Sequence, residues 1–418
     1  MRELKADDFE LETGRHPTDV YILYLFPDAA RFKRPPPRPG KRKAFARKDQ
    51  VKTISYGRAR SGSGRKKVSW RRSLFESLVG SFSLFCPEAR KPPVAPQKIF
   101  VLRNNDIGDL LVITPLFEAL KRTFPDAGII AGVGFWNAEV LLGNPHIYGL
   151  VQVNAPWHNH FVHSQSVRSA IRYIFCSDEA RAIQGVRAEI GIDVLGSGFG
   201  SLLLMRARIP YRLGVRGYAG GDSAAQSSVE YRPDEHVGRQ ALRFAELLGC
   251  TDLPENRPQI FLNQPPRPNG AVVIAPGAGL PEKAWPGSYF VELSGLLRDE
   301  EIIVIGSQND MPLAERICSK NAKSRDLTGK LTLRESFAII GGAKLVICNS
   351  SMAMHAAAAF RRPAVALLGD QFPSATRHHL QWGYPETMML GRDDHHPDTF
   401  GPEEAGMKVR EILSLESK

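Results

Sequence analysis

Three short runs in the sequence bring glycine, hydroxyl or charged residues to places where a strand should give way to a helix. The first runs from Arg103 to Pro115 and contains Gly108-Asp109. It follows an apolar run, which places Asp109 at the start of a predicted helix, where its carboxylate can accept a proton from a bound hydroxyl. Gly108 allows a tight turn there, and free amides at a helix start can bind an anion. A second interpretation, in which Asp109 only caps the helix, stays open.

The second run, from Ala275 to Pro286, holds the two glycines Gly277 and Gly279 after another apolar stretch. The third glycine of a dinucleotide-binding GxGxxG motif is missing, so hydride transfer is poorly supported. Lys283 can instead neutralise phosphate charge, while Trp285 and the proline after it fix the loop. The alternative is a solvated lysine.

The third run, from Cys348 to Ala359, again joins a predicted strand to a helix. Ser350 and Ser351 lie at the helix start, where free amides and hydroxyls suit a diphosphate. His355, about one turn further, is close enough to join them. The alternative is a helix capped by one of the serines, with His355 satisfied inside the fold.

These runs lie in a chain that alternates apolar runs with amphipathic stretches from Lys98 onward, which is typical of parallel α/β architecture. We predict strands at 99–102, 128–133, 150–153, 191–195, 272–275, 302–305, 345–348 and 364–368, and helices at 109–124 and 235–248. A segment rich in Pro and Asn, 251–267, is typical of an interdomain linker. Two such halves imply a cleft where the carboxyl ends of both sheets converge.

The basic charge of the chain is concentrated near its beginning. Residues 32–72 hold 16 Lys and Arg against one acid, Asp49, so their net charge of +15 exceeds the +11 of the whole chain and the remainder sums to −4. This segment is rich in Pro, Gly and Ser and is predicted to be disordered. Apolar residues at helical spacing over 74–85 follow it. They predict either a helix at an anionic membrane surface or a helix packed on the first domain.

Composition excludes several other classes of protein. The five cysteines lie far apart, without metal-site spacing, and are interpreted as free thiols. No apolar run is long enough to span a bilayer and no secretory signal opens the chain, so we expect a cytoplasmic protein, peripheral at most on the inner face of the cytoplasmic membrane.

Taken in order, the three runs resemble the motifs of glycosyltransferase family 9, the ADP-heptose:lipopolysaccharide heptosyltransferases. The family pattern has GD followed by TP, then KxWP, then N-D-[ST]-G-x-x-H. The chain meets it with Gly108-Asp109 and Thr114-Pro115, with Lys283-Ala284-Trp285-Pro286, and with Asn349-Ser350-Ser351-Met352 and His355. Shorter stretches that also resemble the family occur at 193–196, 212–214, 326–329 and 333–335. The resemblance covers residues 98–409.

The resemblance implies a GT-B fold, which is an α/β arrangement of two Rossmann-like domains facing each other across a cleft, here with the disordered basic extension in addition. We place the extension at 1–95, an acceptor domain at 96–255 and a donor domain at 256–418. The implied reaction is inverting, needs no metal or other cofactor, and moves a sugar, usually heptose, from an ADP-sugar to a lipid-linked glycan of the lipopolysaccharide core.

The family's residue roles carry over to matching positions of this chain. Asp109 corresponds to the general base, with Asp106 as a competing candidate, and Lys283 to the cation facing the donor phosphates. The remaining predicted substrate-binding residues are Gly108, Thr114, Trp285, Glu335, Ser350, Ser351, Met352 and His355. Glu335 is near the family's ribose-binding acid, although Arg334 is an alternative match.

The chain departs from the family where Ser350 replaces an aspartate and Met352 replaces a glycine. This departure leaves open a second function, a non-catalytic nucleotide-sugar or glycan-binding paralogue. For the basic extension, an anionic membrane surface is the partner we consider for residues 32–86. A nucleic-acid tether is a further alternative, but no specific nucleic-acid partner is expected, and a solvated or mis-started leader explains the segment equally well.

Overall fold

The computed structural model describes residues 77, 79–84, 86–159, 161, 162, 165–394, 396 and 398–416. The basic segment 32–72 and part of the predicted helix at 74–85 therefore lie outside the described residues. Residues 79–83 are helical, and Val79 is buried in an apolar cluster of the first domain, against which Phe82 also packs. This packing agrees with the interpretation of a helix that rests on the domain. No helix in the described part of the chain is long and apolar enough to cross a membrane.

The first domain is built on a six-stranded parallel sheet with the order β3-β2-β1-β4-β5-β6. Its strands are β1 (Lys98–Leu102), β2 (Gly128–Val133), β3 (Gly149–Gln152), β4 (Ile190–Asp193), β5 (Tyr211–Arg216) and β6 (Ser227–Glu230). Its helices are α2 (Ile107–Leu111), α3 (Pro115–Thr123), the 3₁₀ turn η2 (Ala138–Leu141), α4 (Val167–Cys176), α5 (Asp178–Val186), α6 (Gly198–Arg206) and α7 (Val237–Leu247).

The second domain repeats this order, as β12-β11-β10-β7-β8-β9. Its strands are β7 (Val272–Ala275), β8 (Ile302–Val304), β9 (Ser324–Asp326), β10 (Leu345–Asn349), β11 (Ala364–Leu367) and β12 (Thr387–Leu390). Its helices are η3 (Pro281–Lys283), α8 (Gly287–Leu296), η4 (Gln308–Asp310), α9 (Met311–Cys318), α10 (Leu333–Gly341), α11 (Met352–Ala359), α12 (Ala375–Trp382) and α13 (Pro402–Glu416).

Both sheets place the sequence motifs where the strand order reverses. In each sheet the first and fourth strands are neighbours, β1 with β4 and β7 with β10, and the chain leaves each pair in opposite directions. Ligands of open parallel sheets bind at this point, beyond the carboxyl ends of the strands. The run with Asp109 follows β1, the run with Lys283 follows β7, and the run with Ser350 follows β10. The predicted α/β fold with two Rossmann-like domains is confirmed.

The sequence predicted one continuous helix where the structure has two shorter ones. The expected helix at 109–124 is two helices, α2 and α3, with residues 112–114 between them. Pro115 is the first residue of α3, where its missing N–H costs nothing and its fixed φ favours a new start. The short α2 therefore carries Asp109 on its own, at the edge of the domain.

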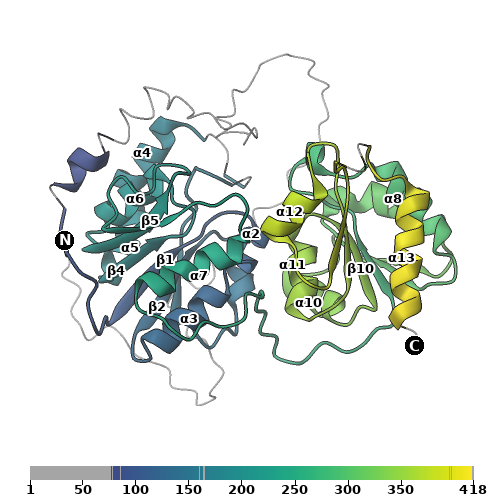
Figure 1. Ribbon diagram of the computed structural model, residues 1–418, viewed down its shortest axis with the longest axis horizontal. Helices are drawn as coiled ribbons and strands as arrows, with labels where there is room; N and C mark the ends of the chain where they lie inside the picture. The colour runs from purple at the N-terminus through teal and green to yellow at the C-terminus, as the bar shows by residue number, and fades with distance from the viewer. Residues whose placement is uncertain are drawn as a thin grey trace.

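Helices α2 and α11 form the most extensive contact between helices of the two domains, and α10 with η2 and α12 with α7 add smaller ones. Figure 1 shows α2 between the first sheet and the α11–α12 side of the second domain. A Cβ atom added at Gly108 would lie 3.0 Å from His355 Cδ2 and 3.6 Å from Met352 Cα. Gly108 does not have a positive φ. The glycine is therefore needed for close approach of the two helices rather than for the tight turn that we predicted from the sequence.

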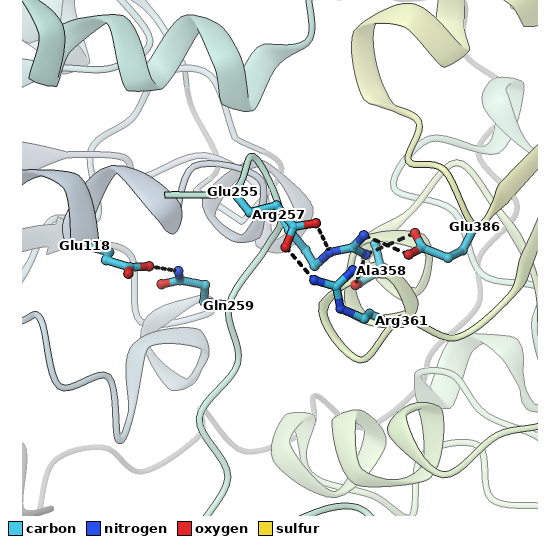
Figure 2. Close-up of polar contacts among 7 residues, drawn as sticks. All are labelled: Glu118, Glu255, Arg257, Gln259, Ala358, Arg361 and Glu386. Atoms are coloured by element: carbon cyan, nitrogen blue, oxygen red, sulfur yellow. Dashed lines mark hydrogen bonds and ion pairs between the residues drawn. The ribbon is translucent and has the colours of Figure 1, made fainter. Parts of the chain in front are cut away.

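The linker between α7 and β7 is tied to both domains by polar contacts (Figure 2). On the first domain, the Gln259 N–H donates to Thr114 Oγ1 at 2.7 Å and the Gln259 side chain donates to Glu118. On the second domain, Arg257 donates to both carboxylate oxygens of Glu386, at 3.0 and 2.7 Å, and to the carbonyl of Ala358 at 2.7 Å. The linker thus sets the distance and angle between the two halves.

Replacing Arg257 with alanine is expected to destabilise the protein by about 2 to 3 kcal/mol, because Glu386 and the Ala358 carbonyl lose a buried, bidentate partner. Arg257 is 8% exposed. Arg361→Ala is the matched control, since the Arg361–Glu255 ion pair at 2.5 Å joins two exposed side chains and should contribute little. Urea unfolding of both variants measures the difference. Equal losses for the two would contradict the assignment of Arg257 as the anchor.

Candidate functional site

A cavity of about 940 Å³ is lined by both domains and contains two of the residues predicted from the sequence. Asp109 lines it from the first domain and Lys283 from the second. The other second-domain residues on its wall are Leu280, Gln381 and Trp382. This volume is large enough for a sizeable small-molecule ligand. The two halves of the molecule therefore each contribute a charged residue, an acid from one and a lysine from the other, to the lining of the same open cavity.

Arg103, the first residue after β1, fixes the carboxylate of Asp109. Its guanidinium donates from Nη2 to Asp109 Oδ1 and from Nε to the Asp109 backbone carbonyl, both at 3.1 Å. Arg103 itself is buried, whereas the Asp109 side chain is 27% exposed. Within the described residues no hydrogen bond reaches Oδ2. One carboxylate oxygen is therefore held in place, while the other is left without a hydrogen bond from the described residues.

His158 lies in the cavity wall near this ion pair. Burial and, to a lesser extent, the positive charge of Arg103 lower its pKa to about 4, and Asp109 acts in the opposite direction. Its backbone carbonyl accepts a hydrogen bond of 2.6 Å from Asn105 Nδ2, which ties the loop after β3 to the loop after β1. The imidazole is thus neutral at neutral pH and adds no charge to the cavity.

The loop that carries Lys283 is anchored by Asn349 at the end of β10. Asn349 Oδ1 accepts a hydrogen bond of 2.8 Å from the Trp285 N–H, and Asn349 Nδ2 donates to the Pro276 carbonyl at 2.7 Å. The Trp285 ring is buried against Phe290, and its Nε1 donates to the Phe400 carbonyl. Trp285 therefore holds the loop from within the core. The ammonium group of Lys283 is exposed and has no ion pair or hydrogen bond among the described residues.

The start of α11 contains the other predicted donor-site residues, and none of Ser350, Ser351, Met352 or His355 lines the cavity described above. Ser350 Oγ lies 2.7 Å from His378 Nε2, and burial together with the nearby Lys283 lowers the pKa of His378 to about 4. Ser351 is the N-cap residue without a side-chain hydrogen bond to the helix. The position of the family's aspartate is thus occupied by a neutral hydroxyl–imidazole pair.

His355 is buried at the domain contact. Its Nδ1 lies 2.7 Å from the Tyr384 hydroxyl, and burial lowers its pKa to about 3, with the nearby His236 and His378 acting in the same direction. Its ring also packs against that of Trp382, which lines the cavity. The residue thus connects α11 to the cavity wall through other side chains, while its own ring stays inside the interface.

The remaining predicted residues lie in the interface or on the surface. Thr114 is buried, donates to the Leu111 carbonyl and accepts the linker contact described above. Glu335 is exposed and completes a capping box with Thr332, whose backbone N–H and hydroxyl lower the pKa of the carboxyl. Arg334, next to it, donates to the carbonyls of Leu142 and Phe261 at 2.9 and 2.8 Å. These contacts join α10 to the first domain and the linker.

Several cavity residues have no predicted role from the sequence. Among them are Arg103, His158, Tyr218 and Trp382. Arg103 had a usable signal, because it lies in the same run as Asp109 and directly after a predicted strand. Tyr218 lies in the turn after β5, a strand that we did not predict, so no signal pointed to it. Among the described residues there is also no cluster of three or more His, Cys, Asp or Glu that could hold a metal ion.

Comparisons of the sequence with a family model and with curated proteins point to the same family. The sequence model of glycosyltransferase family 9 (heptosyltransferase) matches residues 179–399, more than half of the chain. Lipopolysaccharide heptosyltransferase 2 of Escherichia coli K12 is 35% identical over 310 residues, covering 67% of this chain and 85% of the relative. The protein of the same name from Salmonella typhimurium is 26% identical with the same coverage.

Solved structures support the fold. The family 9 glycosyltransferase of Veillonella parvula superposes with a TM-score of 0.63 at 18% identity, covering 78% of this chain and all of that one. The E. coli ADP-heptose lipopolysaccharide heptosyltransferase II superposes with a TM-score of 0.60 at 20% identity, covering 77% of this chain and all of that one. The family match, these relatives and the shared two-domain architecture lead to one conclusion: the chain belongs to glycosyltransferase family 9 and is a glycosyltransferase.

Proposed function

We propose that the protein transfers a heptose from ADP-heptose to a lipopolysaccharide-core or related glycan, with inversion at the anomeric carbon and without a metal ion. The observation that carries the proposal is the cavity lined by Asp109 from one domain and Lys283 from the other. The relatives named lipopolysaccharide heptosyltransferase 2 support the choice of sugar and acceptor. The neighbour named as an ADP-heptose enzyme supports the choice of nucleotide.

In this reaction an acceptor hydroxyl attacks the anomeric carbon as the bond from that carbon to the ADP oxygen breaks. The acceptor proton passes to Asp109, whose Oδ1 is held by Arg103, so that Oδ2 is the natural proton acceptor. The electron pair of the broken bond goes to the departing diphosphate. Lys283 and the free amides at the start of α11 would stabilise that charge.

The neutral serine at position 350 is compatible with the roles proposed for Asp109 and Lys283. The family pattern has an aspartate at this position, whereas here the Ser350 hydroxyl pairs with His378, whose pKa is lowered partly by the nearby Lys283. With serine in this place, the charge of Lys283 stays available for phosphate. We place the reaction in the cytoplasm, at the inner face of the membrane that would carry a lipid-linked acceptor.

The direct test is an assay of ADP release and product mass with ADP-heptose, a core oligosaccharide acceptor and EDTA. We expect ADP and a product heavier by one heptose, whose new linkage has the anomeric configuration opposite to that of the donor by NMR. Calorimetric binding of ADP-heptose without any transfer would instead identify a binding paralogue. Loss of transfer in EDTA would contradict the metal-independent mechanism.

A further inference from the structure

The first-domain wall of the cavity combines aromatic rings with neutral polar side chains such as Asn105, Gln165 and Ser166. Its rings include Trp157, Phe199, Tyr218, Tyr231 and Phe244. Four of them support one another in two pairs, because the Trp157 and Phe199 ring centroids lie 5.6 Å apart and those of Tyr218 and Tyr231 lie 4.8 Å apart. The wall is therefore a prearranged set of flat surfaces rather than a group of mobile side chains.

The charged groups of the cavity are few and already engaged. Among the described lining residues, Arg103 and Lys283 are the only Arg or Lys, and Asp109 is the only acid. Arg103 is paired with Asp109, and Lys283 approaches from the second domain. His158 is neutral at neutral pH because burial lowers its pKa to about 4. The first-domain wall as described thus offers no cation to a second anionic ligand.

This composition distinguishes between classes of acceptor. A phosphate or carboxylate brought against the aromatic wall would lose its hydration without gaining a counter-charge, and it would approach Asp109, which has the same sign. A neutral sugar has an apolar C–H face that can pack on aromatic rings. Its hydroxyls can bond to exposed polar side chains such as Gln165, which lines the same wall.

We infer that the acceptor subsite selects an uncharged sugar, which lies with one face against Tyr218 and its neighbouring rings and presents its hydroxyl to Asp109. Phosphate or carboxylate groups on that sugar are excluded, and acidic parts of a larger glycan stay outside the cavity. The inference rests on the proposed function, since it names the acceptor class of the same site.

The test compares two core oligosaccharides that differ only in a phosphate on the terminal sugar. With ADP-heptose as donor, we expect kcat/KM for the phosphorylated form to be at least about tenfold lower, as an unpaired buried charge requires. Equal or better use of the phosphorylated form would overturn the inference while leaving the proposed function intact. Transfer to neither form would overturn the proposed function, and the inference with it.

Variants of Tyr218 test whether the acceptor sugar lies against this ring. This side chain is 39% exposed, so replacing it should not disturb the core. Tyr218→Ala should raise KM for the neutral acceptor about tenfold without changing KM for ADP-heptose, and Tyr218→Phe, which keeps the ring, should lose less. Tyr148→Ala is the matched control, because Tyr148 is also an exposed first-domain tyrosine but lies outside the cavity.

Tyr218→Arg provides a readout that loss of packing cannot imitate. The added cation can pair with the phosphate, so kcat/KM for the phosphorylated acceptor should rise relative to kcat/KM for the neutral one. An unchanged preference in Tyr218→Arg, together with an unaltered acceptor KM in Tyr218→Ala, would contradict the placement of the acceptor sugar at this wall.

Discussion

Asp109→Asn is expected to lower the turnover of glycosyl transfer by about a hundredfold to ten-thousandfold, the usual contribution of a general base. Asparagine keeps a side-chain oxygen that can accept the hydrogen bond from Arg103 Nη2 but cannot take the acceptor proton. It is a better test than alanine, which would leave the buried Arg103 without its partner. Steady-state kcat with saturating donor and acceptor measures the effect, and circular dichroism checks the fold.

Asp106→Asn is the matched control for this experiment. Asp106 is three residues earlier in the same run and was a competing base on sequence grounds, but it is the residue before α2 and is not among those that line the cavity. Its variant should keep kcat within a few-fold of the wild type. If Asp106→Asn lost turnover and Asp109→Asn did not, the two assignments would have to be exchanged.

Lys283→Ala is expected to lower kcat/KM for the donor by about ten- to a hundredfold, as removal of one charge-assisted contact to a diphosphate implies. The change should weaken the binding of ADP measured by calorimetry, because the phosphates remain in the product. Protein stability should not change, since the ammonium group is exposed and makes no ion pair with described residues. Lys283→Arg, which keeps the positive charge, should retain more of the activity.

Lys320→Ala removes the same charge from an exposed position just after α9 and should leave both ADP binding and turnover unchanged. The comparison separates a local contact from the general effect of net charge on an anionic donor. Equal losses in the two variants would show that Lys283 acts only through the overall field of the protein.

The sequence predicted the sheets well because their strands are continuous β-branched or apolar runs, such as Val272–Ala275 and Ile302–Val304. It missed β5, β6, β9 and β12. β9, Ser324–Asp326, is a polar strand at the edge of its sheet, without the pattern of a buried strand. The break between α2 and α3 was missed because the apolar spacing continues across it, and only Pro115 marks it.

The sequence could predict site residues that directly follow a strand. It could not predict the surroundings of a residue when these depend on how the two domains pack together. Asp109 and Lys283 lie beyond strand ends and reach one cavity. His355 has the same kind of sequence position, yet the approach of α2 to α11 buries it against Gly108. The close contact between these helices depends on how the two domains meet, which the local sequence does not encode.

The most direct measurement is a crystal structure of the protein with an unreactive analogue of ADP-heptose bound. The account predicts that the diphosphate lies within hydrogen-bonding distance of Lys283 Nζ and of the backbone amides at the start of α11. The anomeric carbon should face Asp109 across a space that admits one acceptor hydroxyl. A nucleotide bound away from Lys283, or a sugar whose anomeric carbon points away from Asp109, would contradict the account.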